Sequence, residues 1–221
     1  MRISVIIPTL REPDTVARAI SSARQTLAPF EVIVVDAGSD DGTCEAAASA
    51  GARVLHTPGS RAVAMNAGAR VARGDALLFL HADTTLPEGA GQSVREALCD
   101  ADGGAFRIRY DDGRPLLRAL GNLRLRFLGP VYGDQAIFVT RAVYDRIGGY
   151  RPLPIMEDCD FVLRLRHAGR FLLLPLYVET AARRHRGHGT LRTLARMWTI
   201  QGLYRVGVSP HRLARMYPPT R

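Results

Sequence analysis

The sequence contains no lysine: all 30 basic residues among its 221 positions are arginine. A genome of biased base composition accounts for this better than a need for arginine chemistry. Cysteine is also scarce, with only Cys44, Cys99 and Cys159 and no Cys-x-x-Cys spacing. This pattern indicates a reducing compartment and argues against a structural zinc site. We expect all three cysteines to be buried structural thiols.

Long apolar segments are missing as well. No window approaches the length of a membrane span. The first apolar run, residues 3–7, is too short for a signal peptide and ends in proline. We therefore expect a cytoplasmic location, with peripheral contact at the inner face of the membrane as an extension of that expectation. Apolar residues make up 47% of the chain and charged residues 23%, as in ordinary soluble domains.

Acidic residues are absent from the end of the chain. Residues 180–221 hold nine arginines and no Asp or Glu, so the formal charge of +9 lies there, whereas residues 1–179 are neutral. Such a block suits nucleic acid, an anionic membrane or a phosphorylated ligand. Nucleic acid is disfavoured because no recognition module is present. We divide the chain into a main domain, residues 1–189, and a basic helical extension, residues 190–221.

The extension shows apolar and arginine residues at helical spacing between residues 191 and 205. This pattern favours packing on the main domain or on a second subunit, as in a homodimer. Adhesion to an anionic bilayer and a lid that grips a diphosphate are the alternatives.

The order of apolar runs indicates the fold class. Strands are predicted at residues 3–7, 31–36, 53–56 and 76–80. Between and after them come helices at 43–50, 60–72 and 88–99, and a first helix capped by Asp14. This alternation predicts an α/β fold with a doubly wound, mostly parallel sheet. The second half predicts strands at 103–110, 135–140, 171–174 and 177–180 and helices at 115–128, 141–147 and 157–168, followed by two helices within 190–216.

Carboxylates follow the strands of this pattern. Asp36 closes the second strand, Asp83 follows the fourth, and Glu157 and Asp158 precede a helix. Ligands of open α/β sheets bind outside the carboxyl ends of the strands. The pattern therefore predicts an enzyme site for a metal and a phosphorylated ligand, with one further carboxylate free to act as a base.

The loop after the first strand, residues 8–12, contains no glycine, which argues against an NAD or FAD enzyme. Asp36 suits a nucleobase N–H or a hydroxyl, and its alternative role is to cap the turn after Gly38. Arg61 at a helix start suits a phosphate, and its alternative role is that of a solvated surface residue.

His81 and Asp83 point the same way if the strand continues through them. A divalent cation that bridges two phosphates needs only one or two protein carboxylates, so Asp83 is a candidate ligand. Glu157 and Asp158 crowd each other, which can tune one of them toward general-base strength. Favourable contact with the helix dipole is the structural alternative for this pair.

Over about residues 2–180 the chain resembles the family 2 glycosyltransferases, which have the GT-A fold: a Rossmann-like mixed sheet, mostly parallel, flanked by helices. The shared segments occur in the family's order. They are Ser4-Val5-Ile6-Ile7-Pro8-Thr9, Val34-Val35-Asp36-Ala37-Gly38-Ser39-Asp40-Asp41-Gly42-Thr43, Asn66-x-Gly68, His81-Ala82-Asp83, Gly133-Asp134-Gln135 and Glu157-Asp158.

The resemblance implies a role for each matching residue. Asp36 would read the donor's base, and Pro8, Thr9 and Glu12 would line the nucleotide pocket. Arg61 and Asn66 would lie near the ribose or diphosphate. Asp83 would bind Mn²⁺ or Mg²⁺, with His185 completing the metal shell, contacting the diphosphate or lying exposed in a basic loop. Asp158 would deprotonate the acceptor, and Glu157 would orient it.

The implied activity is metal-dependent, inverting transfer of a hexose-type sugar from a nucleoside-diphosphate sugar to a hydroxyl. We expect a UDP-sugar donor and an acceptor that is a small molecule or is linked to a lipid. The Gln-x-x-Arg-Trp motif of processive members is missing, which favours one sugar per encounter. His81 replaces the first Asp of the usual Asp-x-Asp, which puts the metal's identity in question.

Two other functions stay open at this point. A nucleotidyltransferase would need a glycine-rich, basic loop after the first strand, where this chain has only Arg11. A catalytically inactive module that binds a nucleotide sugar or a membrane surface is the other alternative, and His81 favours it.

Overall fold

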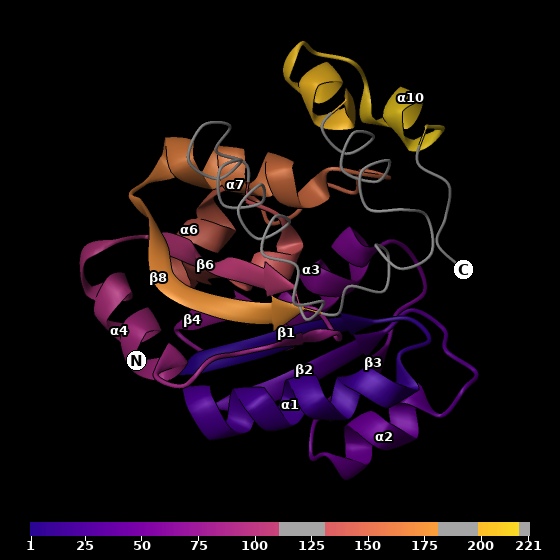
Figure 1. Ribbon diagram of the computed structural model, residues 1–221, viewed down its shortest axis with the longest axis vertical. Helices are drawn as coiled ribbons and strands as arrows, with labels where there is room; N and C mark the ends of the chain where they lie inside the picture. The colour runs from indigo at the N-terminus through magenta and orange to yellow at the C-terminus, as the bar shows by residue number, and fades with distance from the viewer. Residues whose placement is uncertain (111–130, 181–198, 217–221) are drawn as a thin grey trace.

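The computed structural model describes residues 1–110, 131–180 and 199–216. These residues form a mixed α/β fold around one sheet (Figure 1). The helix expected at 115–128, His185 and the first part of the basic extension lie outside the described residues. In the described part of the chain, no helix is long and apolar enough to cross a membrane.

The first half alternates strands and helices as expected. The strands are β1 (Ile3–Thr9), β2 (Glu31–Asp36), β3 (Arg53–His56), β4 (Ala76–Phe79) and β5 (Thr84–Thr85). The helices are α1 (Pro13–Leu27), α2 (Thr43–Ser49), α3 (Arg61–Val71) and α4 (Ala90–Asp100).

The second half adds strands β6 (Gly103–Tyr110), β7 (Ile137–Thr140) and β8 (Phe171–Thr180). Its helices are the 3₁₀ turn η1 (Gly133–Gln135), α6 (Arg141–Arg146), α7 (Glu157–Ala168) and α10 (Pro210–Ala214). Residues 199–205 are also helical.

The sheet has the strand order β3-β2-β1-β4-β7-β6-β8-β5. Strands β3, β2, β1 and β4 run parallel, so their carboxyl ends share one edge. Strand β7 is antiparallel to both β4 and β6, and β6 is parallel to β8. This is a mixed, mostly parallel sheet, as the resemblance to the GT-A fold implies.

Each central strand feeds two apolar cores because successive side chains point to opposite faces. In β1, Val5 packs into the core under α1, α2 and α4, whereas Ile6 packs into the core under α3, α6 and α7. Figure 1 shows α1 and α2 below the central strands and α3, α6 and α7 above them. Helix α3 approaches closely at Gly68, where a Cβ would lie 2.6 Å from Ile6 Cγ2.

Two local predictions are wrong. Asp14 does not cap α1: the helix begins at Pro13, and Glu12 occupies the N-cap position without a side-chain cap. Proline fits the first helical position because its missing N–H would have no partner there. The strands expected at 171–174 and 177–180 are one strand, β8, which passes through exposed Pro175. The pairing with β6 shifts register between Ala105 and Arg107, so the irregularity accommodates a residue that cannot donate to the ladder.

The cysteine expectation is also partly wrong. Cys159 is buried, but Cys44 is partly exposed and Cys99 is exposed. None of the three forms a disulfide. Exposure of Cys99 follows from its place near the end of amphipathic α4, whose other face packs on the sheet.

The described end of the chain folds back onto the main domain. Ile200 and Leu213 are buried in a small apolar cluster with Met156 and Cys159. This cluster lies at the start of α7, and Figure 1 shows the terminal helices, in yellow, above that helix. The C-terminal helices therefore cover the end of α7 at which Glu157 and Asp158 stand.

Candidate functional site

A cavity of about 710 Å³ opens at the carboxyl edge of the parallel strands. Its walls come from the loops after β1, β2 and β4, the loop before α7, the starts of α3 and α7, and the helix at residues 199–205. Seven of the predicted site residues line it: Pro8, Thr9, Glu12, Arg61, Asp83, Glu157 and Asp158. Asp36 and Asn66 are not among the lining residues. The topology thus brings most of the predicted residues to one hollow, although they are far apart in sequence.

The carboxylate of Asp158 is buried and its orientation is fixed by two backbone donors. The N–H of Gly133 donates to Oδ2 at 2.6 Å, and the N–H of Cys159 donates to Oδ1 at 2.7 Å. A Cβ at Gly133 would lie 2.5 Å from His81 Nε2 and 3.4 Å from Asp158 Oδ2. The imidazole of His81 and the carboxylate of Asp158 therefore flank the same glycine, which only a residue without a side chain allows.

Glu157 forms an ion pair with Arg61. The Nη1 atom of Arg61 lies 3.1 Å from Oε1 of Glu157, whose side chain is 9% exposed against 38% for Arg61. The pair joins the first residue of α3 to the first residue of α7 across the cavity. The charges of Arg61 and Glu157 thus neutralise each other in the cavity, and an anionic ligand that binds Arg61 would compete with Glu157.

Asp83 stands half-exposed on the cavity wall. Its Oδ1 accepts two long hydrogen bonds of 3.4 Å, from the hydroxyls of Thr84 and Thr180. The strand does not continue through His81 and Asp83, because β4 ends at Phe79 and residues 82–83 form a turn before β5. One accessible carboxylate fits the protein's share of a Mg²⁺ or Mn²⁺ site, since a bound diphosphate supplies further oxygens.

Asp36 is fully buried and accepts four hydrogen bonds from the chain itself. Its Oδ2 accepts the backbone N–H groups of Gly38 and Ser39 at 2.9 and 2.8 Å. Its Oδ1 accepts the hydroxyls of Ser39 at 2.5 Å and Thr9 at 3.2 Å. Burial acts to raise the pKa of Asp36, but these hydrogen bonds outweigh it and lower the pKa below its usual range. The carboxylate is linked to the cavity wall by its hydrogen bond to Thr9, which lines the cavity. Direct contact between Asp36 and a nucleobase stays a prediction.

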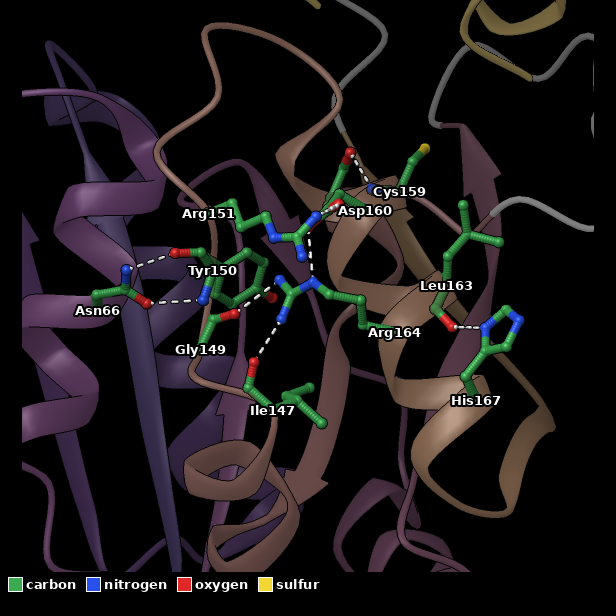
Figure 2. A network of polar contacts seen from close by, with 11 residues as sticks. Asn66, Ile147, Gly149, Tyr150, Arg151, Cys159, Asp160, Leu163, Arg164 and His167 are labelled. Carbon is green, nitrogen blue, oxygen red and sulfur yellow. Dashed lines mark hydrogen bonds and ion pairs between the residues drawn. The ribbon is translucent and has the colours of Figure 1, made fainter. Parts of the chain in front are cut away.

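Asn66 holds a loop through hydrogen bonds to Tyr150 (Figure 2). It is not among the residues that line the cavity. Its Oδ1 accepts the Tyr150 N–H at 2.9 Å and the Tyr144 hydroxyl at 2.7 Å, and its Nδ2 donates to the Tyr150 carbonyl at 2.8 Å. The structure thus gives this side chain the task of fixing the Gly149–Tyr150 turn. A contact with the donor's ribose or diphosphate stays a prediction.

Figure 2 also shows how Arg164 ties this turn to α7. Its guanidinium donates to the carbonyls of Ile147 and Gly149, both at 2.7 Å, and to Asp160 at 2.8 Å. The same Asp160 pairs with Arg151 at 3.2 Å. These contacts hold the start of α7 against the loop before it, and so fix the position of the acidic pair.

The ring of Tyr150 packs against α7, where it stacks on Phe161 with 4.1 Å between the ring centroids. Burial raises the pKa of the Tyr150 hydroxyl far above its usual value, and the charges of Tyr144, Asp158 and Glu157 raise it further. Tyr150 therefore stays protonated and neutral beside the acidic pair.

Sequence reasoning missed three features of the site. Gly133 was noted only as part of a motif, although its N–H orients Asp158. Ile200 was not singled out, yet it forms part of the cavity wall. The third feature is a group of possible metal ligands, Asp36, Cys44 and His56, which the spacing of the cysteines does not reveal.

Comparison with known proteins identifies the family. The model of the family described as "Glycosyl transferase family 2" matches residues 4–151. The chain belongs to this family. The match includes Asp36, Arg61, Asp83 and Gly133, and it ends shortly before the acidic pair of α7.

A curated relative is the PGL/p-HBAD biosynthesis glycosyltransferase Rv2957 of Mycobacterium tuberculosis. It is 34% identical to this glycosyltransferase over 178 residues, which cover 73% of this chain and 68% of the relative. The level of identity and the family match support sugar transfer as the activity of this chain.

Solved structures show the same fold. The mannosyltransferase PcManGT of Pyrobaculum calidifontis, in complex with GDP-Man and Mn²⁺, aligns with a TM-score of 0.71 and 20% identity, covering 97% of this chain and 68% of that one. Glucosyl-3-phosphoglycerate synthase of Mycobacterium tuberculosis, in complex with Mn²⁺, UDP and glucosyl-3-phosphoglycerate, aligns with a TM-score of 0.62 and 23% identity, covering 94% and 80%. At these identities the likeness establishes the GT-A fold alone.

Proposed function

We propose that this glycosyltransferase moves a single hexose from a nucleoside-diphosphate sugar, most simply a UDP-sugar, to an acceptor hydroxyl with inversion. The observation that carries the proposal is that Arg61, Asp83, Glu157 and Asp158 line one cavity. This set combines a cation for a diphosphate, a ligand for a divalent metal and a carboxylate base. Structures with similar folds contain UDP or GDP-Man together with Mn²⁺, which supports this donor class.

Asp158 is the proposed base. Because two backbone N–H groups fix its carboxylate, the oxygens present their remaining lone pairs to the cavity in one orientation. The acceptor O–H gives its proton to Asp158 as its oxygen bonds to the anomeric carbon. The bond from that carbon to the diphosphate oxygen breaks on the opposite face, which inverts the anomeric centre. Glu157, beside the base, orients the acceptor.

Arg61 is the proposed diphosphate contact. Its guanidinium stands at the first residue of α3, where the backbone N–H groups of the first turn also favour anions. Asp83, with His185 as a predicted second ligand, would hold Mn²⁺ or Mg²⁺. A metal bound there would offset the charge that develops on the departing nucleoside diphosphate. Pro8, Thr9 and Glu12 would line the nucleotide pocket, with Asp36 reading the base.

The acceptor carries a hydroxyl and is a small molecule or is linked to a lipid. The curated relative is named for PGL/p-HBAD biosynthesis, and phenolic and lipid-linked hydroxyls are therefore the first acceptors to assay. Peripheral membrane contact through the basic extension and a homodimer remain predictions.

A thermal-shift panel tests the donor class. UDP, GDP, ADP and their sugars are added with and without Mn²⁺, and the melting temperature is recorded, because a ligand that binds only the folded state raises it. We expect UDP compounds with Mn²⁺ to give the largest rise. A panel without any rise would reject the donor site.

A second measurement separates an enzyme from an inactive binding module. Release of UDP from the best UDP-sugar is followed with water as the acceptor. We expect slow, metal-dependent hydrolysis. Binding without any hydrolysis or transfer would favour the binding module.

A further inference from the structure

Three side chains converge beside the proposed nucleotide pocket, outside the residues that line it. Asp36 ends β2, Cys44 lies in the first turn of α2, and His56 ends β3. Their potential ligand atoms all lie within 4.8 Å of one another. Asp36 and His56 are register partners in neighbouring strands, with His56 Nδ1 at 4.0 Å from Asp36 Oδ2.

The donor set is one sulfur, one imidazole nitrogen and one carboxylate oxygen. Thiolate and imidazole ligands select Zn²⁺ and related cations, whereas Mg²⁺ and Mn²⁺ prefer oxygen. Three protein ligands also match zinc sites that keep a fourth position open. The set therefore differs in chemistry from the carboxylate site predicted at Asp83.

The three ligand atoms need to move only slightly closer together to bind one cation. Ligand atoms on one tetrahedral zinc lie roughly 3.5 Å apart, given bonds of about 2.0–2.3 Å. His56 can supply this movement because its side chain is 71% exposed. Asp36 does not need to move, since hydrogen bonds from Gly38, Ser39 and Thr9 already fix its carboxylate. Such outer contacts orient a ligand and favour binding.

We propose that Asp36, Cys44 and His56 form a binding site for a thiophilic divalent cation such as Zn²⁺. On binding, the Cys44 thiol gives its proton to solvent, a metal–sulfur bond forms, and neutral His56 donates a nitrogen lone pair. No electron is transferred. If the proposed function holds, a cation on Asp36 competes with the nucleobase, and Zn²⁺ inhibits donor binding.

Titration of the full chain with Co²⁺, a spectroscopic substitute for Zn²⁺, tests the site directly. Absorbance from thiolate-to-cobalt charge transfer reports a bond to cysteine. We expect such a band in the wild type, its loss in Cys44→Ser, and at least tenfold weaker Co²⁺ binding in His56→Gln. The matched controls are Cys99→Ser and His167→Gln, which change an exposed cysteine and an exposed histidine elsewhere.

The controls should keep both the band and the affinity. Absence of the band in the wild type, its persistence in Cys44→Ser, or unchanged affinity in His56→Gln would each overturn the proposal. Cys44→Ala gives a second variant with the same expected loss, and circular dichroism confirms that each variant is folded.

Competition by UDP separates this site from the proposed function. We expect saturating Zn²⁺ to weaken UDP binding to the wild type at least tenfold. In Cys44→Ser, the affinity for UDP should be the same with and without Zn²⁺. A cobalt band without any UDP binding would leave the metal site intact and reject the donor. UDP binding without the cobalt band would keep the donor site and reject the metal site.

Discussion

The guanidinium of Arg61 lies 3.1 Å from the carboxylate of Glu157, although 96 residues separate the two in sequence. In the proposed function these residues serve different substrates, because Arg61 contacts the donor diphosphate and Glu157 orients the acceptor. The pair must therefore separate, at least in part, when a donor binds. Donor binding and the freedom of Glu157 are then coupled.

This coupling predicts the effect of Glu157→Gln on UDP affinity. The change removes the competing carboxylate and one negative charge from a site that takes an anion, so UDP should bind about two- to tenfold more tightly, consistent with a partly exposed pair. Transfer should fall, because the acceptor loses its orienting group. Isothermal titration with UDP measures the affinity.

The matched control is Asp75→Asn, which breaks the exposed pair between Arg2 and Asp75 at the opposite ends of the strands. It should leave UDP affinity unchanged. Weaker UDP binding in Glu157→Gln would show that Arg61 depends on the pair for its position.

The contact between Gly133 and His81 predicts a second effect. In Gly133→Ala the new Cβ would meet His81 Nε2 at 2.5 Å. Relief of this clash displaces the imidazole or the backbone that orients Asp158, so the free energy of unfolding should fall by about 1–3 kcal/mol. Sugar transfer should fall as well. Urea denaturation and release of UDP measure the two effects.

A double variant isolates the cause. Adding His81→Ala to Gly133→Ala removes the atom that clashes, so the double variant should lose less stability than the sum of the single changes. Strict additivity would mean that the strain lies elsewhere.

The hydrogen bonds of Asp36 predict how stability depends on pH. Its pKa is lowered in the folded protein, so the carboxylate stabilises the fold in full above its ordinary value of 3.8, and this contribution is lost as pH falls below that value. Asp36→Asn should therefore cost about 1.5–3 kcal/mol at neutral pH and less at pH ~3. Urea denaturation across this range measures the difference. A cost that is equal at both pH values would contradict the assignment.

Packing of the C-terminal helix gives a further prediction. Leu213 is fully buried against the cluster that contains Met156, next to the acidic pair. Leu213→Ala should cost about 2–5 kcal/mol, because it leaves a cavity in this cluster. Val206→Ala is the control, since Val206 is 79% exposed, and it should change stability little. Equal effects in urea denaturation would show that the helix does not depend on this contact.

The sequence predicted the fold well where local pattern and global packing agree. Continuous apolar runs placed β2 and β3 at their observed bounds, because the side chains of each strand pack into both cores. It missed β5, since two threonines form a strand only by pairing with the distant Thr180 and Glu179. Pro175 led to the prediction of two strands where there is one, because the irregular register that accommodates it depends on the partner strand.

The site was predictable where it follows from topology. Carboxyl ends of parallel strands share one edge, so the position of Asp83 could be anticipated. The role of Asn66 in holding Tyr150 could not, because that turn is close to it only in the folded chain. The convergence of Cys44 with His56 was hidden for the same reason: ligands from separate elements leave no spacing motif.

The most direct test of the central claim compares Asp83→Asn with Asp158→Asn. Both residues line the cavity, but the account assigns one to donor binding and the other to proton transfer. With Mn²⁺ present, Asp83→Asn should weaken UDP binding at least tenfold. Asp158→Asn should bind UDP about as well as the wild type, while release of UDP from the donor sugar falls by about 10²–10⁴. Undiminished turnover in Asp158→Asn would contradict the account.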